Sequence, residues 1–225
     1  MLELLDDNLW CATHHFTALG LPVSTRMTVV RLPGGDLWLH SPIPIGPALR
    51  EQLEALGRVA FVIAPSKTHH LFVGPCVAAF PEATAFGAPG LREKRPALGF
   101  LRDLPEGAAA PWQSDLEHLV FGGIPFANET VWFHRPSATL IVTDLVQWWR
   151  GDLPWQARAY ASLTSVRRRL AVPRTVRSLV RAPAAARASA ARILKWDFKR
   201  IVMAHNTVVE VDAKADMQRA TACFG

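Results

Sequence analysis

Short apolar runs alternate with helical patterns in the first third of the chain. Residues 27–32 form a β-branched run that stops at a Pro-Gly-Gly-Asp turn, and residues 37–40 form a second run, so this pair predicts a hairpin. Apolar residues at helical spacing over 48–56 predict a helix, and the near-continuous apolar run at 59–64 predicts a strand with both faces covered. This order indicates an α/β fold.

The same alternation continues further along the chain and then gives way to a helical region. A short strand is predicted at 84–87, whereas the Pro, Gly and Ala content of 92–112 predicts a loop with at most one turn of helix. Further strands are predicted at 116–121, 129–134, 139–143 and 200–204, and a closing helix at 212–222. The Ala- and Arg-rich stretch between the last two strands has several prolines, which predicts several separate helices.

Length and composition are those of one folded domain. The chain has 225 residues, of which 50% are hydrophobic and 20% charged, so we expect a single globular domain over 1–225 and not a disordered protein. The net charge of +6 is unevenly placed, because 13 of the 25 Lys and Arg residues lie in 150–200, where Asp152 and Asp197 are the acidic residues. We therefore predict a basic helical insertion at about 148–199.

Cysteine usage and the start of the chain favour a cytoplasmic protein. Cys11, Cys76 and Cys223 are far apart and form no CxxC pair, which argues against a disulfide framework and against a structural zinc knot. The first residues are acidic where a signal peptide is basic, and no apolar run approaches the roughly 20 residues that span a bilayer. The chain also lacks the GxGxxG, Walker A and GxSxG motifs, so no nucleotide fingerprint or serine nucleophile is indicated.

Polar side chains recur where the predicted strands end or begin. In layered α/β folds ligands gather at strand ends, and imidazole and carboxylate groups are the ligands that suit Zn, Fe or Mn. A single histidine at such a position is more often a capped or solvent-facing residue, so the prediction rests on the recurrence. The positions are His40, His69 with His70, Asn128 with Glu129, Asp144, and His205.

In this order of elements the chain resembles the metallo-β-lactamase superfamily, and within it the DUF4336 family. The matching segments are TRMTVVRLPGGDLWLHSP, LEALGRVAFVIAPSKTHHLFVGP, ETVWFHRPSATLIVTDLVQ and WDFKRIVMAHNTVVEVDA. The resemblance covers nearly the whole chain. It implies a four-layer αββα sandwich, an α/β (α+β) fold, with a site at one edge of the two sheets.

The metal-binding motif of the superfamily is partly rewritten here. Its HxHxDH loop falls on residues 65–70, where His70 keeps its type, His69 stands in place of the Asp, and Lys67 in place of a His. The resemblance further matches Asp144 to the bridging Asp and His205 to the final His. Glu129 falls near the position of the third-motif His, and His40 stands where a strand-end Asp is expected.

These departures change the predicted chemistry. A cation at Lys67 repels a metal ion, so we predict at most one divalent metal (Zn, Fe or Mn) instead of two. Its ligands are expected among His69, His70, Glu129, Asp144 and His205. Asp144 is also a predicted catalytic residue, and Lys67 is predicted to hold an anionic substrate group or to pair with Asp144.

Two functions follow as hypotheses. The first is a metal-dependent hydrolase of an anionic small molecule, in which the metal activates water. The alternative is a non-catalytic scaffold that binds nucleic acid, an anionic membrane surface or a protein through its Arg-rich face, because Arg with interleaved Trp grips phosphates and stacks bases. The cluster at Arg167, Arg168 and Arg169 is the centre of that alternative, whereas a solvated helical face explains the same pattern without a partner.

Overall fold

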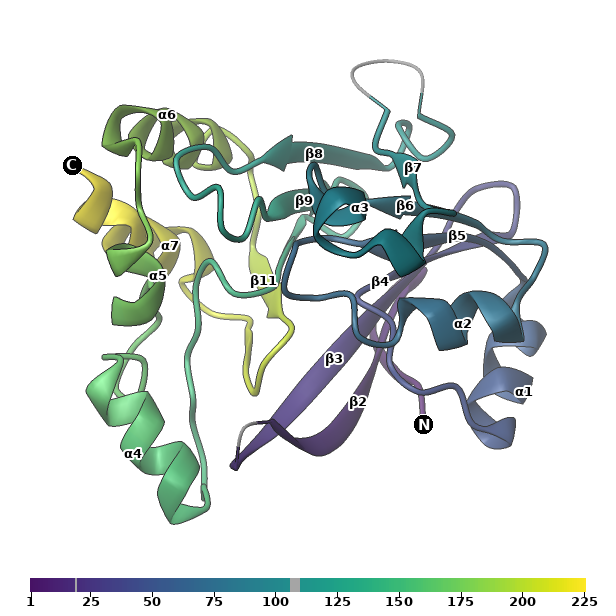
Figure 1. Cartoon of the computed structure of the whole chain (residues 1–225), viewed down its shortest axis with the longest axis horizontal. Helices are drawn as coiled ribbons and strands as arrows, with labels where there is room; N and C mark the ends of the chain where they lie inside the picture. The colour runs from purple at the N-terminus through teal and green to yellow at the C-terminus, as the bar shows by residue number, and fades with distance from the viewer. Residues whose placement is uncertain (19, 106–109) are drawn as a thin grey trace. The chain divides into compact units, whose positions relative to one another are not determined.

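A computed structural model describes residues 1–18, 20–105 and 110–225, so part of the predicted loop at 92–112 lies outside the described residues. Contacts between residues divide the chain into two compact units (Figure 1). Unit 1 consists of Met1–His14 and Arg26–Leu116, and unit 2 of His15–Thr25 and Glu117–Gly225. The single domain over 1–225 stays a prediction.

A seven-stranded sheet contains the strands of the N-terminal half, and these neighbour one another in sequence order. Strands β3 and β4 are antiparallel and pair Val29 with Leu39, which confirms the predicted hairpin. Strands β4 to β7 are parallel. The strands are β1 (Glu3–Asp6), β2 (Leu9–Ala18), β3 (Leu21–Arg31), β4 (Asp36–His40), β5 (Arg58–Ala64), β6 (Thr84–Gly87) and β7 (Arg102–Asp103).

Helices cover the parallel part of this sheet because parallel strands need crossover connections. Helices α1 (Pro47–Leu56) and α2 (Val73–Ala79) both pack on β5, as Figure 1 shows. Helix α1 begins at a proline, whose fixed φ suits the first helical position. The short helices α3 (Leu91–Lys94) and η1 (Pro96–Leu98) precede β7. The core of the unit forms between these helices and the apolar residues of β3 to β6.

The sheet of unit 2 has five strands in the order β12-β11-β10-β9-β8. Strands β9 and β10 are antiparallel, whereas β10 and β11 are parallel and pair Leu140 with Ile201. All residues of β9 and β10 are buried, which explains their near-continuous apolar sequence. The strands are β8 (Leu116–Val120), β9 (Thr130–His134), β10 (Thr139–Val142), β11 (Arg200–Met203) and β12 (Val208–Val209).

The helical prediction for the basic stretch is confirmed. Helices α4 (Trp155–Leu163), α5 (Arg174–Ser178) and α6 (Pro183–Ile193) occupy it, each beginning at or directly after a proline. The closing helix α7 (Ala213–Thr221) packs on β11 and is followed by η3 (Ala222–Phe224). Among the described residues, no helix combines the length and apolar character needed to cross a membrane.

Gly57 at the end of α1 gives a test of this packing. A methyl group there would collide with the carbonyl oxygen of Gly35 in the β3–β4 turn, so we expect Gly57→Ala to lower the free energy of unfolding by about 2 kcal/mol. Gly34→Ala is the matched control, because its methyl meets nothing within 4 Å, and it should change stability by less than about 0.5 kcal/mol. Urea unfolding measures both, and equal midpoints for the two variants would contradict the packing described.

Candidate metal centre

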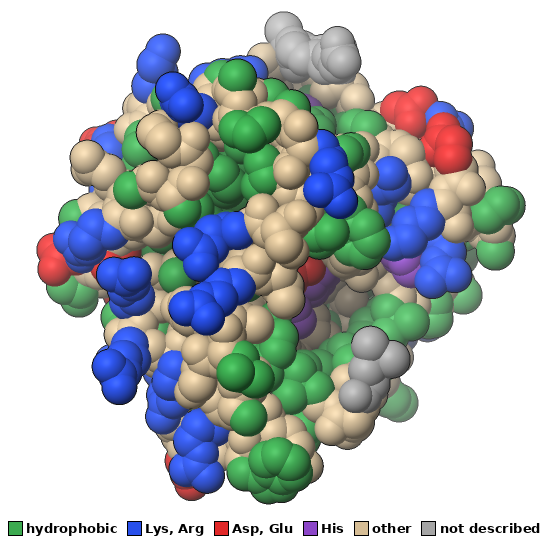
Figure 2. All heavy atoms as spheres, turned by 60° about the vertical axis from the view of Figure 1, so that its left-hand side comes forward, with side chains coloured by type: hydrophobic (Ala, Val, Ile, Leu, Met, Phe, Trp, Pro, Cys, Tyr) green, Lys and Arg blue, Asp and Glu red, His purple; other side chains and the backbone are tan. Residues whose placement is uncertain are grey.

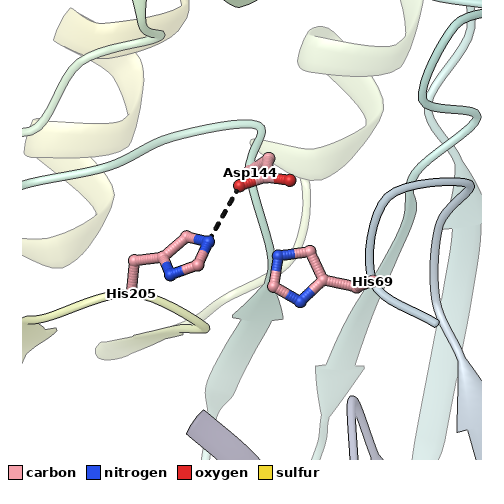
Figure 3. A group of neighbouring side chains, drawn as sticks. All are labelled: His69, Asp144 and His205. Atoms are coloured by element: carbon pink, nitrogen blue, oxygen red, sulfur yellow. Dashed lines mark ion pairs between the residues drawn. The ribbon is translucent and has the colours of Figure 1, made fainter. Parts of the chain in front are cut away.

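Two neighbouring strands of unit 2 end side by side, and a candidate ligand follows each. The parallel strands β10 and β11 pair Val142 with Met203, so the residues two positions further on, Asp144 and His205, lie at the same edge of the sheet. His205 Nε2 lies 3.2 Å from Asp144 Oδ1 (Figure 3). The side chains of His205 and Asp144 are 14% and 21% exposed, so the pair is shielded but still reachable from solvent.

The second ring nitrogen of His205 determines what Nε2 can do. Nδ1 lies 2.7 Å from the carbonyl oxygen of Ser24, and because a carbonyl only accepts, Nδ1 must carry a proton and donate it. A neutral ring would therefore point the lone pair of Nε2 at the Asp144 carboxylate. That arrangement is favourable only when a proton or a cation lies between the two atoms.

The pKa of His205 reflects the same arrangement. Burial acts to lower this pKa, but the hydrogen bond and the negative charge of Asp144 outweigh burial and raise it above its usual value of 6.5. The carbonyl of Ser24 also favours the charged ring. The raised pKa therefore favours the ring form that carries a proton on Nε2.

Glu129 holds the turn that carries Asp144. Its two carboxylate oxygens accept the backbone N–H groups of Thr143, Asp144 and Leu145 at 2.7, 2.9 and 2.8 Å. Burial and the charge of Asp144 raise the pKa of Glu129 to about 7, against the N–H bonds, which lower it. The three amides lie just beyond β10, where the sheet no longer supplies acceptors, so Glu129 replaces the missing strand.

A hydrogen-bonded chain continues from Asp144 toward α4. Gln147 Nε2 donates to Asp144 Oδ1 at 3.0 Å, and Gln147 Oε1 accepts the indole N–H of Trp149 at 2.9 Å. The Trp149 ring lies 6.2 Å from the His205 ring. The carboxylate of Asp144 is therefore oriented from two sides, by His205 and by Gln147.

In unit 1 the loop after β5 carries the other candidates. Ser66 Oγ accepts the backbone N–H groups of Thr68 and His69 at 3.2 and 3.0 Å, which tightens the turn that the predicted motif occupies. His69 Nδ1 lies 2.9 Å from Ser41 Oγ, and Ser41 has a left-handed φ of 53° directly after β4. The ring of His69, also drawn in Figure 3, is thus held by its Nδ1 side.

His70 and Lys67 lie in a different electrostatic environment. Arg95 Nε donates to His70 Nε2 at 3.5 Å, and Lys94 Nζ donates to the carbonyl oxygen of Lys67 at 2.7 Å. Burial and then the charges of Arg95 and Lys94 lower the pKa of His70. The same positive charges disfavour a metal ion at His70.

Of the residues predicted from the sequence, the structure brings Asp144, His205 and Glu129 together in unit 2. His69, His70 and Lys67 share one loop of unit 1, and His40 is buried at the end of β4, stacked on Trp38 with ring centroids 5.4 Å apart. The sequence analysis missed Ser24, Ser41 and Gln147. A backbone carbonyl such as that of Ser24 leaves no mark in a sequence, whereas a Gln three residues after the Asp could have been noted.

Solved structures define the class of protein. Metallo-β-lactamases from Pontibacter korlensis, Erythrobacter litoralis and Hirschia baltica match with TM-scores of 0.64, 0.67 and 0.65 and identities of 12%, 13% and 11%. The matches cover 100%, 98% and 98% of this chain and 98%, 95% and 97% of those chains. The chain has the metallo-β-lactamase fold, which confirms the predicted αββα architecture.

Sequence comparison then gives the family. Residues 6–154 match the domain of unknown function DUF4336, so the chain belongs to this family and the recognition from sequence is confirmed. The match ends at the residue before α4 and so leaves α4 to α7 outside it. No curated protein sequence matches the chain.

Burial of His40 gives a prediction for pH. Burial, and then the charge of His69, lower the pKa of His40 from 6.5 to about 3, so the folded protein binds fewer protons than the unfolded chain between these values. Stability should therefore fall as the pH drops from about 6.5 toward 3. Between pH 7 and pH 4, His40 should account for a loss of about 3 kcal/mol in the free energy of unfolding.

Denaturant unfolding across this range tests the contribution. We expect His40→Gln to flatten the pH dependence, while exposed His15→Gln, the matched control, keeps the wild-type slope. Identical slopes for wild type and His40→Gln would show that His40 does not remain neutral in the fold.

Proposed function

We propose that this protein binds one divalent metal ion (Zn, Fe or Mn) through Asp144 and His205 of unit 2 and uses it to hydrolyse an anionic small molecule. The observation that carries the proposal is the tautomer of His205. Its Nδ1 proton is committed to the carbonyl of Ser24, so Nε2, 3.2 Å from a carboxylate oxygen, is the ring nitrogen that can bind an ion when it is not protonated. Histidine metal ligands characteristically donate their second ring N–H to a carbonyl or carboxylate in this way.

The donor set suits the proposed ions. Within unit 2, His205 and Asp144 offer an imidazole nitrogen and a carboxylate oxygen, donor types found in many catalytic metal sites (Figure 3). His69 of unit 1 stays a ligand predicted from the sequence. His69 can serve as a ligand when Nδ1 donates to Ser41 Oγ, because Nε2 then carries the lone pair. A divalent ion in such a site acts as a Lewis acid and lowers the pKa of a water molecule.

Glu129 and His70 are left out of the proposed ligand set for separate reasons. Glu129 already accepts three backbone N–H groups, and turning its carboxylate to an ion would leave buried donors without a partner. His70 Nε2 accepts a hydrogen bond from Arg95, and the charges of Arg95 and Lys94 lie close to its ring. With these two residues excluded, the remaining donors support one ion and not two.

The chain's own residues have distinct proposed roles in this reaction. Asp144 binds the ion and is held by Gln147 and by the turn that Glu129 braces. His205 would bind the ion through Nε2, and a proton on that nitrogen would leave to solvent, since ion and proton compete for the same lone pair. Lys67 stays the predicted partner of an anionic substrate group.

Metal binding should depend on the proposed ligands and not on nearby residues of the same type. We expect Asp144→Asn and His205→Ala to weaken Zn²⁺ or Mn²⁺ binding by more than about a hundredfold, because each removes a ligand. The matched controls are exposed Asp152→Asn and exposed His15→Ala, which should bind as the wild type does. Titration calorimetry of chelator-dialysed protein, with elemental analysis, measures the affinity and the stoichiometry.

The variant Glu129→Gln tests whether Glu129 holds the turn that carries Asp144 or binds the metal ion itself. We expect it to lower protein stability but to weaken metal binding by about tenfold or less, since its effect passes through the position of Asp144. A loss as large as that of His205→Ala would make Glu129 a ligand. Stoichiometric binding that survives in both Asp144→Asn and His205→Ala would contradict the proposed site.

Hydrolysis is tested after metal binding. Wild-type protein loaded with Zn²⁺ or Mn²⁺ should hydrolyse p-nitrophenyl esters or p-nitrophenyl phosphates, and Asp144→Asn should not. Metal binding without turnover on any of these probes would support the metal site and remove the support for hydrolysis of these bond types.

A further inference from the structure

An open hollow with three arginines lies where α4 leads into α5, within unit 2. It has a volume of about 510 Å³ and is lined by Ala161, Ser162, Ser165, Arg167, Arg168 and Arg169. No acidic residue is among the lining residues. Figure 2 shows that Lys and Arg side chains gather over this part of the surface, with few acidic side chains between them.

The backbone around the hollow is held in place by hydrogen bonds. Val166 N–H donates to the carbonyl of Ala161 at 2.9 Å, and Gln147 and Ala171 form an isolated bridge on the other side of the three arginines. Ser165 has a left-handed φ of 70°, which turns the chain sharply after α4. Beneath this turn, Val166 packs with Trp149, Ala157 and Ala161 in a small apolar core.

The first arginine is fixed by the backbone that it contacts. Arg167 donates from Nη1 to the carbonyl of Trp149 at 3.0 Å and from Nη2 to the carbonyl of Gly151 at 3.1 Å. Neither acceptor neutralises its charge, because carbonyls are uncharged. A guanidinium has five N–H donors, so Arg167 keeps donors for a ligand while its side chain is already ordered.

The next two arginines, Arg168 and Arg169, are exposed. Within the described part of the chain, no salt bridge joins Arg168 or Arg169 to an acidic side chain. Three adjacent guanidinium groups repel one another, and an anion between them relieves that repulsion. The hydroxyl group of Ser165 adds a donor of the kind that completes a phosphate site, whereas Ser162 Oγ already donates to the carbonyl oxygen of Arg158 at 2.8 Å.

We propose that this hollow binds the phosphate group of a polyvalent phosphorylated ligand through Arg167, Arg168, Arg169 and Ser165. Arginine forks match the oxygens of phosphate in bidentate geometry, and three positive charges suit a ligand with more than one phosphate charge. The volume exceeds that of a single phosphate and is within the range of small-molecule sites. The site does not depend on a metal at Asp144.

A local phosphate site fits the observations better than an extended surface that stacks bases. Of the four tryptophans of the basic stretch, Trp149 is buried, Trp148 packs under the guanidinium of Arg150, and Trp196 stacks on Phe133. Trp155, 69% exposed, is the one that presents most of its ring to solvent. A stacking platform would need several exposed rings.

Pyrophosphate is the probe for the site. Titration calorimetry of metal-free protein, in chelator and at about 0.15 M salt, removes binding through a metal and screens diffuse attraction. We expect the double variant Arg168→Gln/Arg169→Gln to weaken pyrophosphate binding by about a hundredfold, or about tenfold for each guanidinium. The matched control Arg181→Gln/Arg192→Gln removes the same charge from exposed positions outside the hollow and should change affinity less than about twofold.

The outcomes separate a phosphate site from general attraction. Equal losses in the two double variants, no binding of pyrophosphate to the wild type, or equally tight binding of citrate would each overturn the proposal. A short single-stranded oligonucleotide then identifies the source of the phosphate. If Arg168→Gln/Arg169→Gln alone weakens oligonucleotide binding, the phosphate belongs to nucleic acid, and if neither variant does, it belongs to a small phosphorylated molecule.

Discussion

Three backbone N–H groups beyond the end of β10 have no neighbouring strand to accept their hydrogen bonds, and the carboxylate of Glu129 accepts all three. A buried N–H without an acceptor costs more than an ordinary hydrogen bond contributes, so this requirement fixes the shape of the turn. This turn fixes the position of Asp144. The Asp144 carboxylate orients His205 and accepts a hydrogen bond from Gln147. The geometry of the candidate metal centre in unit 2 thus depends on Glu129, which we propose as a brace and not as a ligand.

The pair formed by Asp144 and His205 favours a positive charge between its two facing atoms. The carbonyl of Ser24 accepts a hydrogen bond from His205 Nδ1, and the charge of Asp144 raises the pKa of His205. In a metallo-β-lactamase fold this pair occupies the ends of two parallel strands, where the sheet delivers side chains to one edge. For the metal binding that we propose, this geometry implies that an ion and a proton compete for His205 Nε2.

Positive charges gather in two parts of the chain. Lys94 and Arg95, at the end of α3, contact the loop after β5 that carries Lys67 and His70, and their charges disfavour a metal ion at His70. Beyond the residues matched to DUF4336, Arg167, Arg168 and Arg169 line a hollow with no acidic residue in its lining. The first group limits where the proposed ion can bind, and the second is the basis of the proposed phosphate site.

The sequence by itself determined the fold class, most strands of the two sheets and the polar residues at their ends, because burial on both faces leaves apolar runs and turn residues that can be read directly. It did not reveal the strands β1, β2, β7 and β12, whose pairing depends on neighbours and on few apolar positions. For the candidate site it identified Asp144, His205 and Glu129 but gave Glu129 the role of a ligand in place of the brace we now propose. Only the tertiary structure decided which atoms each side chain contacts, since hydrogen bonds to backbone groups such as Ser24 O and Leu145 N–H depend on the folded path of the chain and not on residue type.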